Sequence, residues 1–344
     1  MDRRTDLRLA DLTTLRVGGP ARAVVVVYTE EDLVAAVHDA GEAALVVGGG
    51  SNLLVGDQGY DGTAVVVRTR GVGVQVDDAE VRLDLAAGEV WDDVVAGAVA
   101  EGWGGVEALS GIPGLVGATP MQNVGAYGQQ VSETIARVRT FDRVTGRRRS
   151  FAAADCGFDY RTSRFKAEPG RFVVLGVELS LSRGAEGTVD YSELARSLGV
   201  GVGDRVPLRQ SRDAVLELRR SKGMLLDPSD HDTWSAGSFF TNPVLTAEGA
   251  AALPAAAPRF PQAGGLVKTS AAWLIENAGF ARGYTLDADT SVALSGKHSL
   301  AITNTGGATA AAVVALATHL RQGVRDRFGI TLEPEPVLVG CTLG

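Results

Sequence analysis

The sequence predicts an α+β protein of more than one domain, and three observations support this prediction. The chain has 344 residues, which is more than one ordinary hydrophobic core accommodates, so two or three domains are expected. Its opening follows a β-α-β pattern, and a second region of strands and helices comes after it. From about Ser211 the pattern changes to short strands, loops and one long helix.

The opening alternates between buried strands and an amphipathic helix. Residues 23–28 are continuously apolar, as in a strand covered on both faces. Thr29 is the expected N-cap of a helix, because three acidic residues follow it and Gly41 is placed to end the helix. Residues 44–47 form the next strand, which leads directly into the glycines at 48–50.

The later elements follow from periodicity and turn residues in the same way. Alternation predicts a strand at 81–86, and a helical pattern predicts a helix at 90–100. The other expected elements are strands at 138–141, 172–181 and 292–302, helices at 211–220, 271–277 and 309–328, an Ala/Pro-rich surface loop at 251–261, and an edge strand broken by prolines at 332–339.

Composition and charge exclude several classes of protein. The net charge of −8 argues against a general nucleic-acid-binding protein, and the aliphatic runs are far too short to span a bilayer. Residues 1–6 carry both charge signs and lead into no apolar segment, so no secretory signal is expected and the cytoplasm is the expected location. The cysteines, Cys156 and Cys341, lack metal-ligand spacing and cannot form a disulfide framework, so no metal site is expected.

Two glycine-rich loops are the candidate cofactor site. In the first, residues 48–52, three glycines let backbone N–H groups approach an anion closely. This loop lacks the dinucleotide fingerprint G-x-G-x-x-G, because position 53 is leucine. The second, residues 110–128, is long enough to wrap a flavin dinucleotide with backbone donors. A tight turn and an irregular buried loop are the alternative interpretations. The residues expected to contact the cofactor are Gly48, Gly49, Gly50, Ser51, Asn52, Ile112, Pro113, Gly114, Gly117, Ala118, Thr119, Gln122, Asn123, Gly125, Ala126, Tyr127 and Gly128.

The segment from Trp234 to Pro243 holds a candidate proton donor. It places Ser238 between a glycine and two phenylalanines. The glycine allows a sharp turn in the backbone, and the aromatic rings exclude water from the hydroxyl. A weak acid that is held in position in such a pocket can deliver a proton. The alternative is a strand end whose serine hydroxyl is satisfied by a local hydrogen bond.

Together these motifs resemble the UDP-N-acetylenolpyruvoylglucosamine reductases, flavoproteins of peptidoglycan precursor synthesis. The matching residues follow in order through most of the chain: 14–18, 48–52, 112–128, 160–161, 191, 222, 237–243, 297–298 and 332–335. The resemblance implies an FAD-binding body of two α/β subdomains, of the vanillyl-alcohol-oxidase type, and a separate α+β substrate-binding domain. It divides the chain into FAD-binding subdomain 1 (1–70, joined by 329–344), FAD-binding subdomain 2 (71–210) and the substrate-binding domain (211–328).

The resemblance also implies an activity. The enzyme would use FAD and NADPH to reduce the enolpyruvyl ether of UDP-N-acetylglucosamine enolpyruvate to the lactyl ether of UDP-N-acetylmuramate. Many related oxidases tether their flavin through His or Cys, and neither loop contains either residue, so a non-covalent FAD is expected. No nucleic-acid or membrane partner is expected, and the chain is expected to be a monomer. A related FAD-dependent oxidase and a non-catalytic nucleotide-sugar binder are the alternatives.

Three residues carry the chemistry that the resemblance implies. Ser238 corresponds to the family's proton donor, Arg161 to its active-site arginine and Glu335 to its active-site glutamate. Taken without the resemblance, Arg161 is typical of a surface charge over an aromatic ring, and Glu335 of a solvated carboxylate.

Further residues correspond to contacts with the UDP-sugar. They are Tyr160, Tyr191, Lys222, Asn242 and His298. Residues 189–194 resemble the mobile tyrosine loop that one of the family's two types carries. Taken alone, Lys222 is typical of an exposed helix end, and His298 of a surface or packing histidine. Some members have lysine where this chain has Thr241, so no extra phosphate contact is expected there.

Overall fold

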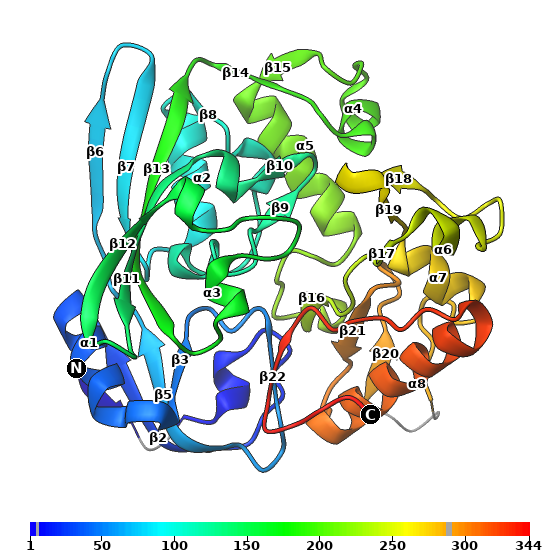
Figure 1. Cartoon of the computed structure of the whole chain (residues 1–344), viewed down its shortest axis with the longest axis horizontal. Coiled ribbons are helices and arrows are strands. Elements are labelled where there is room, and N and C mark those ends of the chain that lie inside the picture. The colour runs from blue at the N-terminus through cyan, green and yellow to red at the C-terminus, as the bar shows by residue number, and fades with distance from the viewer. Residues whose placement is uncertain (5–6, 287–290) are drawn as a thin grey trace. The chain divides into compact units, whose positions relative to one another are not determined.

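Figure 1 shows the computed structural model of the chain, which describes residues 1–4, 7–286 and 291–344. The described residues form two compact units, each built from segments distant in sequence. Unit 1 takes in 1–6, 21–49 and 61–225, and unit 2 takes in 7–20, 50–60 and 226–344. The division into three domains stays a prediction. Thr5 and Asp6 in its first part and residues 287–290 in its third lie outside the described residues.

The opening of unit 1 is a sheet packed against one helix. The strands run in the order β1 (Asp2–Arg4), β2 (Ala21–Val27), β5 (Tyr60–Val67) and β3 (Ala44–Val47). Helix α1 (Glu30–Ala40) has the predicted ends: the Thr29 hydroxyl accepts the Asp32 N–H at 3.0 Å, and Gly41 (φ 54°) follows the last turn. Its Leu33 and Val37 are buried in a core with valines of β2 and β5.

A larger antiparallel sheet forms the body of unit 1. Its strands run in the order β12 (Arg147–Ala152), β11 (Ile135–Asp142), β13 (Phe172–Arg183), β7 (Glu80–Ala86) and β6 (Val72–Val76), and β8 (Trp103–Gly104) also pairs with β13. Helix α2 (Trp91–Ala100) buries Trp91 and Val95 against Leu83, Leu85 and Leu179 of this sheet. The predicted alternation of 81–86 and helix at 90–100 are therefore confirmed.

The rest of unit 1 carries candidate site residues. It consists of β9 (Gly125–Ala126), β10 (Gln129–Gln130), α3 (Arg164–Ala167), β14 (Glu186–Thr188), α4 (Ser192–Leu198), β15 (Arg205–Pro207) and α5 (Leu208–Ser221). Strands β14 and β15 form an antiparallel pair, and the chain between them carries α4 (Figure 1). Helix α4 packs against α5, where Leu194 and Val215 share one apolar cluster.

Unit 2 is built from short strands around one long helix. Its elements are β4 (Leu53–Val55), β16 (Ser235–Ser238), β17 (Val244–Leu245), α6 (Ala247–Ala251), β18 (Phe260–Pro261), β19 (Val267–Lys268), α7 (Ala271–Asn277), β20 (Val292–Leu294), β21 (Ala301–Asn304), α8 (Ala310–Phe328) and β22 (Val337–Val339). The sheets have the orders β16-β21-β20 and β17-β19-β18, and β22 pairs in parallel with β4. The predicted face of α8 is confirmed, since Val313, Leu320 and Val324 are fully buried.

One prediction about unit 2 is wrong. The strand expected at 292–302 is a hairpin of β20 and β21, because the Ser295 hydroxyl accepts the N–H groups of Lys297 and His298 and turns the chain. Most of the stretch 251–261 is exposed, as predicted, but Leu253 and Ala257 are buried in the core of unit 2. None of the helices in 1–4, 7–286 and 291–344 has the length and apolar character needed to cross a membrane.

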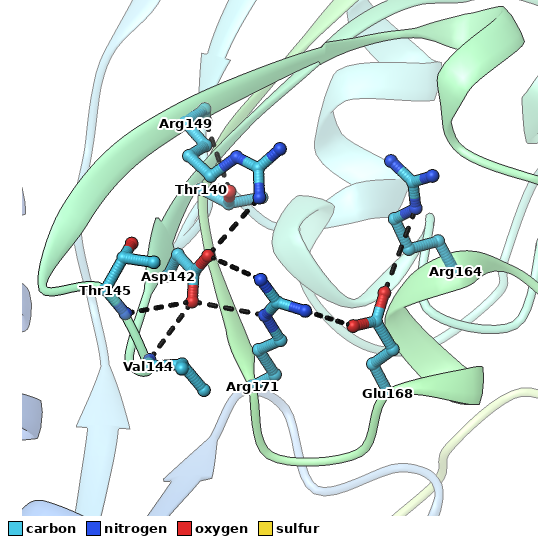
Figure 2. Close-up of polar contacts among 8 residues, drawn as sticks. All are labelled: Thr140, Asp142, Val144, Thr145, Arg149, Arg164, Glu168 and Arg171. Carbon is cyan, nitrogen blue, oxygen red and sulfur yellow. Dashed lines mark hydrogen bonds and ion pairs between the residues drawn. The ribbon is translucent and has the colours of Figure 1, made fainter.

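A buried aspartate closes one end of the large sheet (Figure 2). Asp142, fully buried at the end of β11, accepts two hydrogen bonds from Arg171, at 3.2 and 3.0 Å, and a longer one from Arg149. The backbone N–H groups of Val144 and Thr145 in the following turn also donate to it. The Arg171 bonds lower the pKa of Asp142 to about 2, opposed by burial and helped by the turn N–H groups and Arg149.

We therefore expect Asp142→Asn to destabilise the protein by about 2 kcal/mol at pH 7. The folded carboxyl has a lowered pKa, so its contribution is complete above the unfolded pKa of about 4 and is lost as the pH falls toward 2. Urea denaturation at pH 7 and pH 3 should show the difference between wild type and variant shrinking at the lower pH. Asp61→Asn, which removes an exposed partner of Arg22, is the control and should change little. An equal loss of stability in Asp142→Asn at both pH values would contradict the prediction.

Candidate functional site

The first glycine loop passes from unit 1 to unit 2 between Gly49 and Gly50. In unit 1, a Cβ added at Gly49 would lie 2.7 Å from the Cα of Gly114, so the two predicted cofactor loops meet backbone against backbone. In unit 2, Gly50 has φ 62°, and a Cβ there would lie 1.8 Å from the Leu12 carbonyl oxygen. Side chains are thus excluded at both positions, which leaves the main chain to approach a ligand.

Helix α2 anchors the start of the second loop. The Trp91 indole donates to the Leu109 carbonyl and the Trp91 N–H to the Gly114 carbonyl, each at 3.1 Å. Glu89 and Ala87, just before the helix, accept the N–H groups of Val116 and Gly117. The second loop is therefore an ordered segment tied to the sheet.

Sequence reasoning missed one residue that holds this loop, Asp92. Its Oδ1 accepts the Gly111 N–H at 2.6 Å, and Arg212 of α5 donates to both carboxylate oxygens at 2.6 and 2.9 Å. Burial works to raise the pKa of Asp92, but the bonds from Arg212 and Gly111 and the charges of Arg212 and Arg219 lower it overall. The sequence signal was an acidic residue in a first helical turn, which does not reveal a partner 120 residues away.

The end of the second loop is organised by Asn123. Its side-chain amide donates to Gln130 at 2.9 Å and to the Asp159 carbonyl at 3.2 Å, and its Oδ1 accepts the Ser132 N–H at 3.1 Å. The side chain is 2% exposed, and φ is 48°. These bonds commit the side chain of Asn123 to shaping the loop, so its proposed contribution to cofactor binding is through the backbone.

Arg161 contacts the same end of the loop. Its Nη2 donates to the Gly125 carbonyl at 2.8 Å and its Nη1 to the Asn123 carbonyl at 3.5 Å, while its guanidinium lies 5.4 Å from the centre of the Tyr160 ring. The structure thus brings two residues of the predicted site, Arg161 and Tyr160, to the predicted cofactor loop. The alternative interpretation, a charge over an aromatic ring, describes the contact with Tyr160 but does not account for the hydrogen bonds to the loop carbonyls.

Backbone strain is concentrated at these residues. Among the residues that the structure describes, the non-glycine residues with positive φ are Arg16, Asn123, Tyr127 and Arg161. Such conformations persist only where the surroundings enforce them, and they recur at functional sites. Three of these residues belong to the site predicted in unit 1.

A second cluster in unit 1 joins predicted substrate residues. The rings of Tyr127 and Tyr191 pack edge to face with centres 5.8 Å apart, and the Lys222 Nζ lies 5.5 Å from the centre of the Tyr127 ring. The same Nζ donates to Glu193 at 2.6 Å. Burial raises the pKa of Tyr127 to about 12 and also raises the pKa of Tyr191, so both phenols are neutral hydrogen-bond donors at physiological pH.

Unit 2 brings Ser238, Glu335 and Asn52 to one place. The Glu335 N–H donates to the Phe239 carbonyl at 2.9 Å, next to Ser238 at the end of β16. Asn52 donates to the Glu335 carbonyl at 3.3 Å, and the Asn52 carbonyl accepts the Val337 N–H at 2.9 Å. Three segments far apart in sequence therefore meet at the predicted proton donor.

The remaining predicted residues have structural partners of their own. Thr14 links the glycine loop to the serine strand, since its N–H donates to Gly50 and its hydroxyl to Ser235, the latter at 2.7 Å. The Asn242 Oδ1 accepts the Ala271 N–H at 2.9 Å at the start of α7. The His298 Nδ1 accepts the Leu300 N–H at 3.3 Å in the β20–β21 turn.

The site fits a flavin dinucleotide. Two glycine loops that meet through their main chains and exclude side chains are suited to a pyrophosphate. Cys156 is fully buried, and burial raises the pKa of its thiol to about 11, so it is a poor nucleophile for a flavin tether. Residues 21–151 match the family described as FAD binding domain. The chain is therefore an FAD-dependent oxidoreductase.

Known proteins identify the particular family. Residues 227–339 match the family described as UDP-N-acetylenolpyruvoylglucosamine reductase, C-terminal domain. Proteins of that name from Cutibacterium acnes and Streptomyces coelicolor are 54% and 52% identical, each over 98% of this chain and 90% of its own length. The crystal structure of the reductase from Thermus caldophilus superposes with a TM-score of 0.66 and 26% identity, covering 98% of both chains. The chain belongs to the UDP-N-acetylenolpyruvoylglucosamine reductase family, and the predicted fold class is confirmed.

We expect the purified protein to be yellow and to release its flavin on acid precipitation, because both glycine loops lack His and Cys and the Cys156 thiol is buried. The absorbance spectra of the supernatant and the redissolved pellet measure this directly. A flavin that stays with the pellet would show a covalent link. A colourless protein that FAD cannot reconstitute would contradict the assignment of the two loops.

Proposed function

We propose that this protein reduces the enolpyruvyl ether of UDP-N-acetylglucosamine enolpyruvate to the lactyl ether of UDP-N-acetylmuramate, a step in peptidoglycan precursor synthesis. One observation carries the proposal: the Glu335 N–H is bonded to the Phe239 carbonyl at 2.9 Å, which fixes a carboxylate-bearing residue beside the strand end that carries Ser238. The family membership supports the same reaction.

The cofactors complete the proposal. Bound FAD would supply the hydride chemistry, with NADPH as the source of the reducing equivalents and the enolpyruvyl group as the acceptor. The sequence has no dinucleotide fingerprint of the Rossmann type that would provide a separate nicotinamide domain. NADPH and the sugar nucleotide therefore use one site in turn. We further propose that the protein is a cytoplasmic monomer and that it has no nucleic-acid or membrane partner.

Arg161 is proposed to hold the carboxylate of the substrate. Hydride addition leaves negative charge on the carbon beside that carboxylate, as an enolate. A guanidinium offers two parallel hydrogen bonds to a carboxylate and stabilises the added charge. The bonds from Arg161 to the Gly125 and Asn123 carbonyls orient its guanidinium before any substrate binds. Glu335 shares this task if it is protonated, or it orients a water molecule.

Ser238 is proposed to deliver the proton that completes the reduction. It ends β16 directly after Gly237, whose φ is 74°, and before Phe239 and Phe240, which are each 1% exposed. These neighbours fix the backbone that carries the hydroxyl. A serine hydroxyl is a weak acid, but an enolate carbon is a strong base, so a positioned serine can transfer its proton.

Ser238→Ala should separate the two half-reactions. NADPH should reduce the flavin at the wild-type rate, because that step takes no proton from serine. Reoxidation by the enolpyruvyl sugar should slow by about 10²–10⁴-fold, because the enolate then lacks a positioned acid. Ser238→Cys should recover part of the rate, since a thiol is also an acid. Anaerobic stopped-flow absorbance of the flavin measures both steps.

Ser235→Ala is the matched control, because it removes the same atom three residues earlier on the same strand, where the hydroxyl accepts the Gly237 N–H. Equal slowing of both half-reactions in Ser238→Ala would show that Ser238 shapes the pocket rather than donating the proton. A flavin that oxygen reoxidises and the enolpyruvyl sugar does not would favour an oxidase and overturn the proposed function.

Tyr191→Phe should weaken binding of the sugar nucleotide more than it slows flavin reduction. The proposed role of the phenol is to donate to a diphosphate oxygen, and a hydrogen bond to a charged group contributes about 1.5–3 kcal/mol. The dissociation constant should therefore rise roughly tenfold to a hundredfold. Titration calorimetry measures it, with Tyr28→Phe as a control at another exposed tyrosine of unit 1. An unchanged constant would show that Tyr191 only packs against Tyr127.

A further inference from the structure

Lys222, the lysine that is proposed to bind the substrate, forms an ion pair with Glu193. The Lys222 Nζ donates to the Glu193 Oε2 at 2.6 Å, joining the C-terminal end of α5 to the first turn of α4. The two side chains are 28% and 34% exposed, so a ligand arriving from solvent can reach both.

The ion pair is not needed to hold the two helices together. Leu194 and Ala195 of α4 are buried in an apolar cluster with Val215 of α5, and this packing provides the main contact between the helices. A partly exposed ion pair adds little stability to such a contact. Glu193 is also favourably placed in the first turn of α4 without any partner, because the N-terminus of a helix attracts a carboxylate.

The charge of Glu193 acts directly on the proposed ligand site. Its carboxylate neutralises the Lys222 ammonium and repels any phosphate that approaches it. The pair lies against the aromatic cluster of Tyr127 and Tyr191, two residues proposed to contact the cofactor and the sugar nucleotide. A diphosphate that binds Lys222 must therefore compete with a carboxylate that is already bound.

We propose that Glu193 is a specificity-determining residue that occupies Lys222 until the diphosphate of the sugar nucleotide displaces it. The inference rests on the proposed function, because it takes Lys222 as a contact of the UDP-sugar. Ligands that carry a diphosphate overcome the competition, whereas ligands without phosphate gain nothing at Lys222. The competition also keeps the affinity for the product moderate, because both the substrate and the product carry the same diphosphate.

The test is calorimetric titration of the FAD-loaded protein with UDP-N-acetylglucosamine, which carries the diphosphate but lacks the enolpyruvyl group. Glu193→Gln should lower its dissociation constant by about three- to fivefold, which is the size of one partly exposed ion pair. The dissociation constant of uridine, which has no phosphate, should not change. In turnover, KM for the enolpyruvyl sugar should fall while kcat does not rise.

Glu217→Gln is the matched control. It removes one negative charge from α5, where Glu217 pairs with Arg220 and both side chains are more than 60% exposed. This variant should bind both ligands as the wild type does. A purely structural role of Glu193 would lower the melting temperature and leave both dissociation constants unchanged, which would overturn the inference. A weaker affinity for UDP-N-acetylglucosamine in Glu193→Gln would also overturn it, because it would show that Glu193 orients Lys222.

Lys222→Met separates this inference from the function on which it rests. It should raise the dissociation constant of UDP-N-acetylglucosamine and leave that of uridine unchanged. If Lys222→Met has no effect, the assignment of Lys222 to the substrate is wrong and the inference fails with it. If Lys222→Met weakens binding but Glu193→Gln does not strengthen it, only the inference about Glu193 fails.

Discussion

The arrangement around the predicted proton donor in unit 2 depends on the hydrogen bond from the Glu335 N–H to the Phe239 carbonyl. Pro334 and Pro336 have no N–H, so Glu335 is the donor between the two prolines and Val337 is the first donor after them. The first donates beside Ser238, and the second donates to the Asn52 carbonyl. These bonds place the backbone of Glu335 beside the serine strand and the backbone of Val337 beside the glycine loop.

Unit 1 shapes its own predicted cofactor loops by a different physical constraint. Its loops approach too closely for side chains at Gly49, and its strained residues, Asn123, Tyr127 and Arg161, adopt conformations that each cost free energy. Buried hydrogen bonds hold at least one of them in place, because three protein partners saturate the Asn123 side chain. These protein hydrogen bonds hold the loop in one shape, and a loop held in this way loses little further conformational entropy when it binds a ligand.

Local signals in the sequence predicted most of the local structure, and contacts over long separations account for the residues missed at the site. The Thr29 cap and the ends of α7 follow from neighbouring residues, and both are confirmed. The turn after Ser295 carried a signal, a Ser-Gly pair, which the apolar pattern of 292–302 concealed. Among the site residues, the two glycine loops and Ser238 stood out by composition. Asp92 and Glu193 did not, because a carboxylate in a helical turn is typical of a solvated surface until its partner is known.

The partners of the two basic residues proposed to bind substrate differ in charge, and this difference has a consequence. Arg161 is held by the Gly125 and Asn123 carbonyls, dipoles that orient the guanidinium and leave its charge intact. Lys222 is held by Glu193, a full charge that cancels its own. Arg161, which is proposed to stabilise charge that arises during the reaction, is thus oriented without being neutralised. Lys222 is proposed to bind a diphosphate that is already charged in the ground state. Its positive charge can be partly offset, because tighter ground-state binding would not lower the barrier of the chemical step.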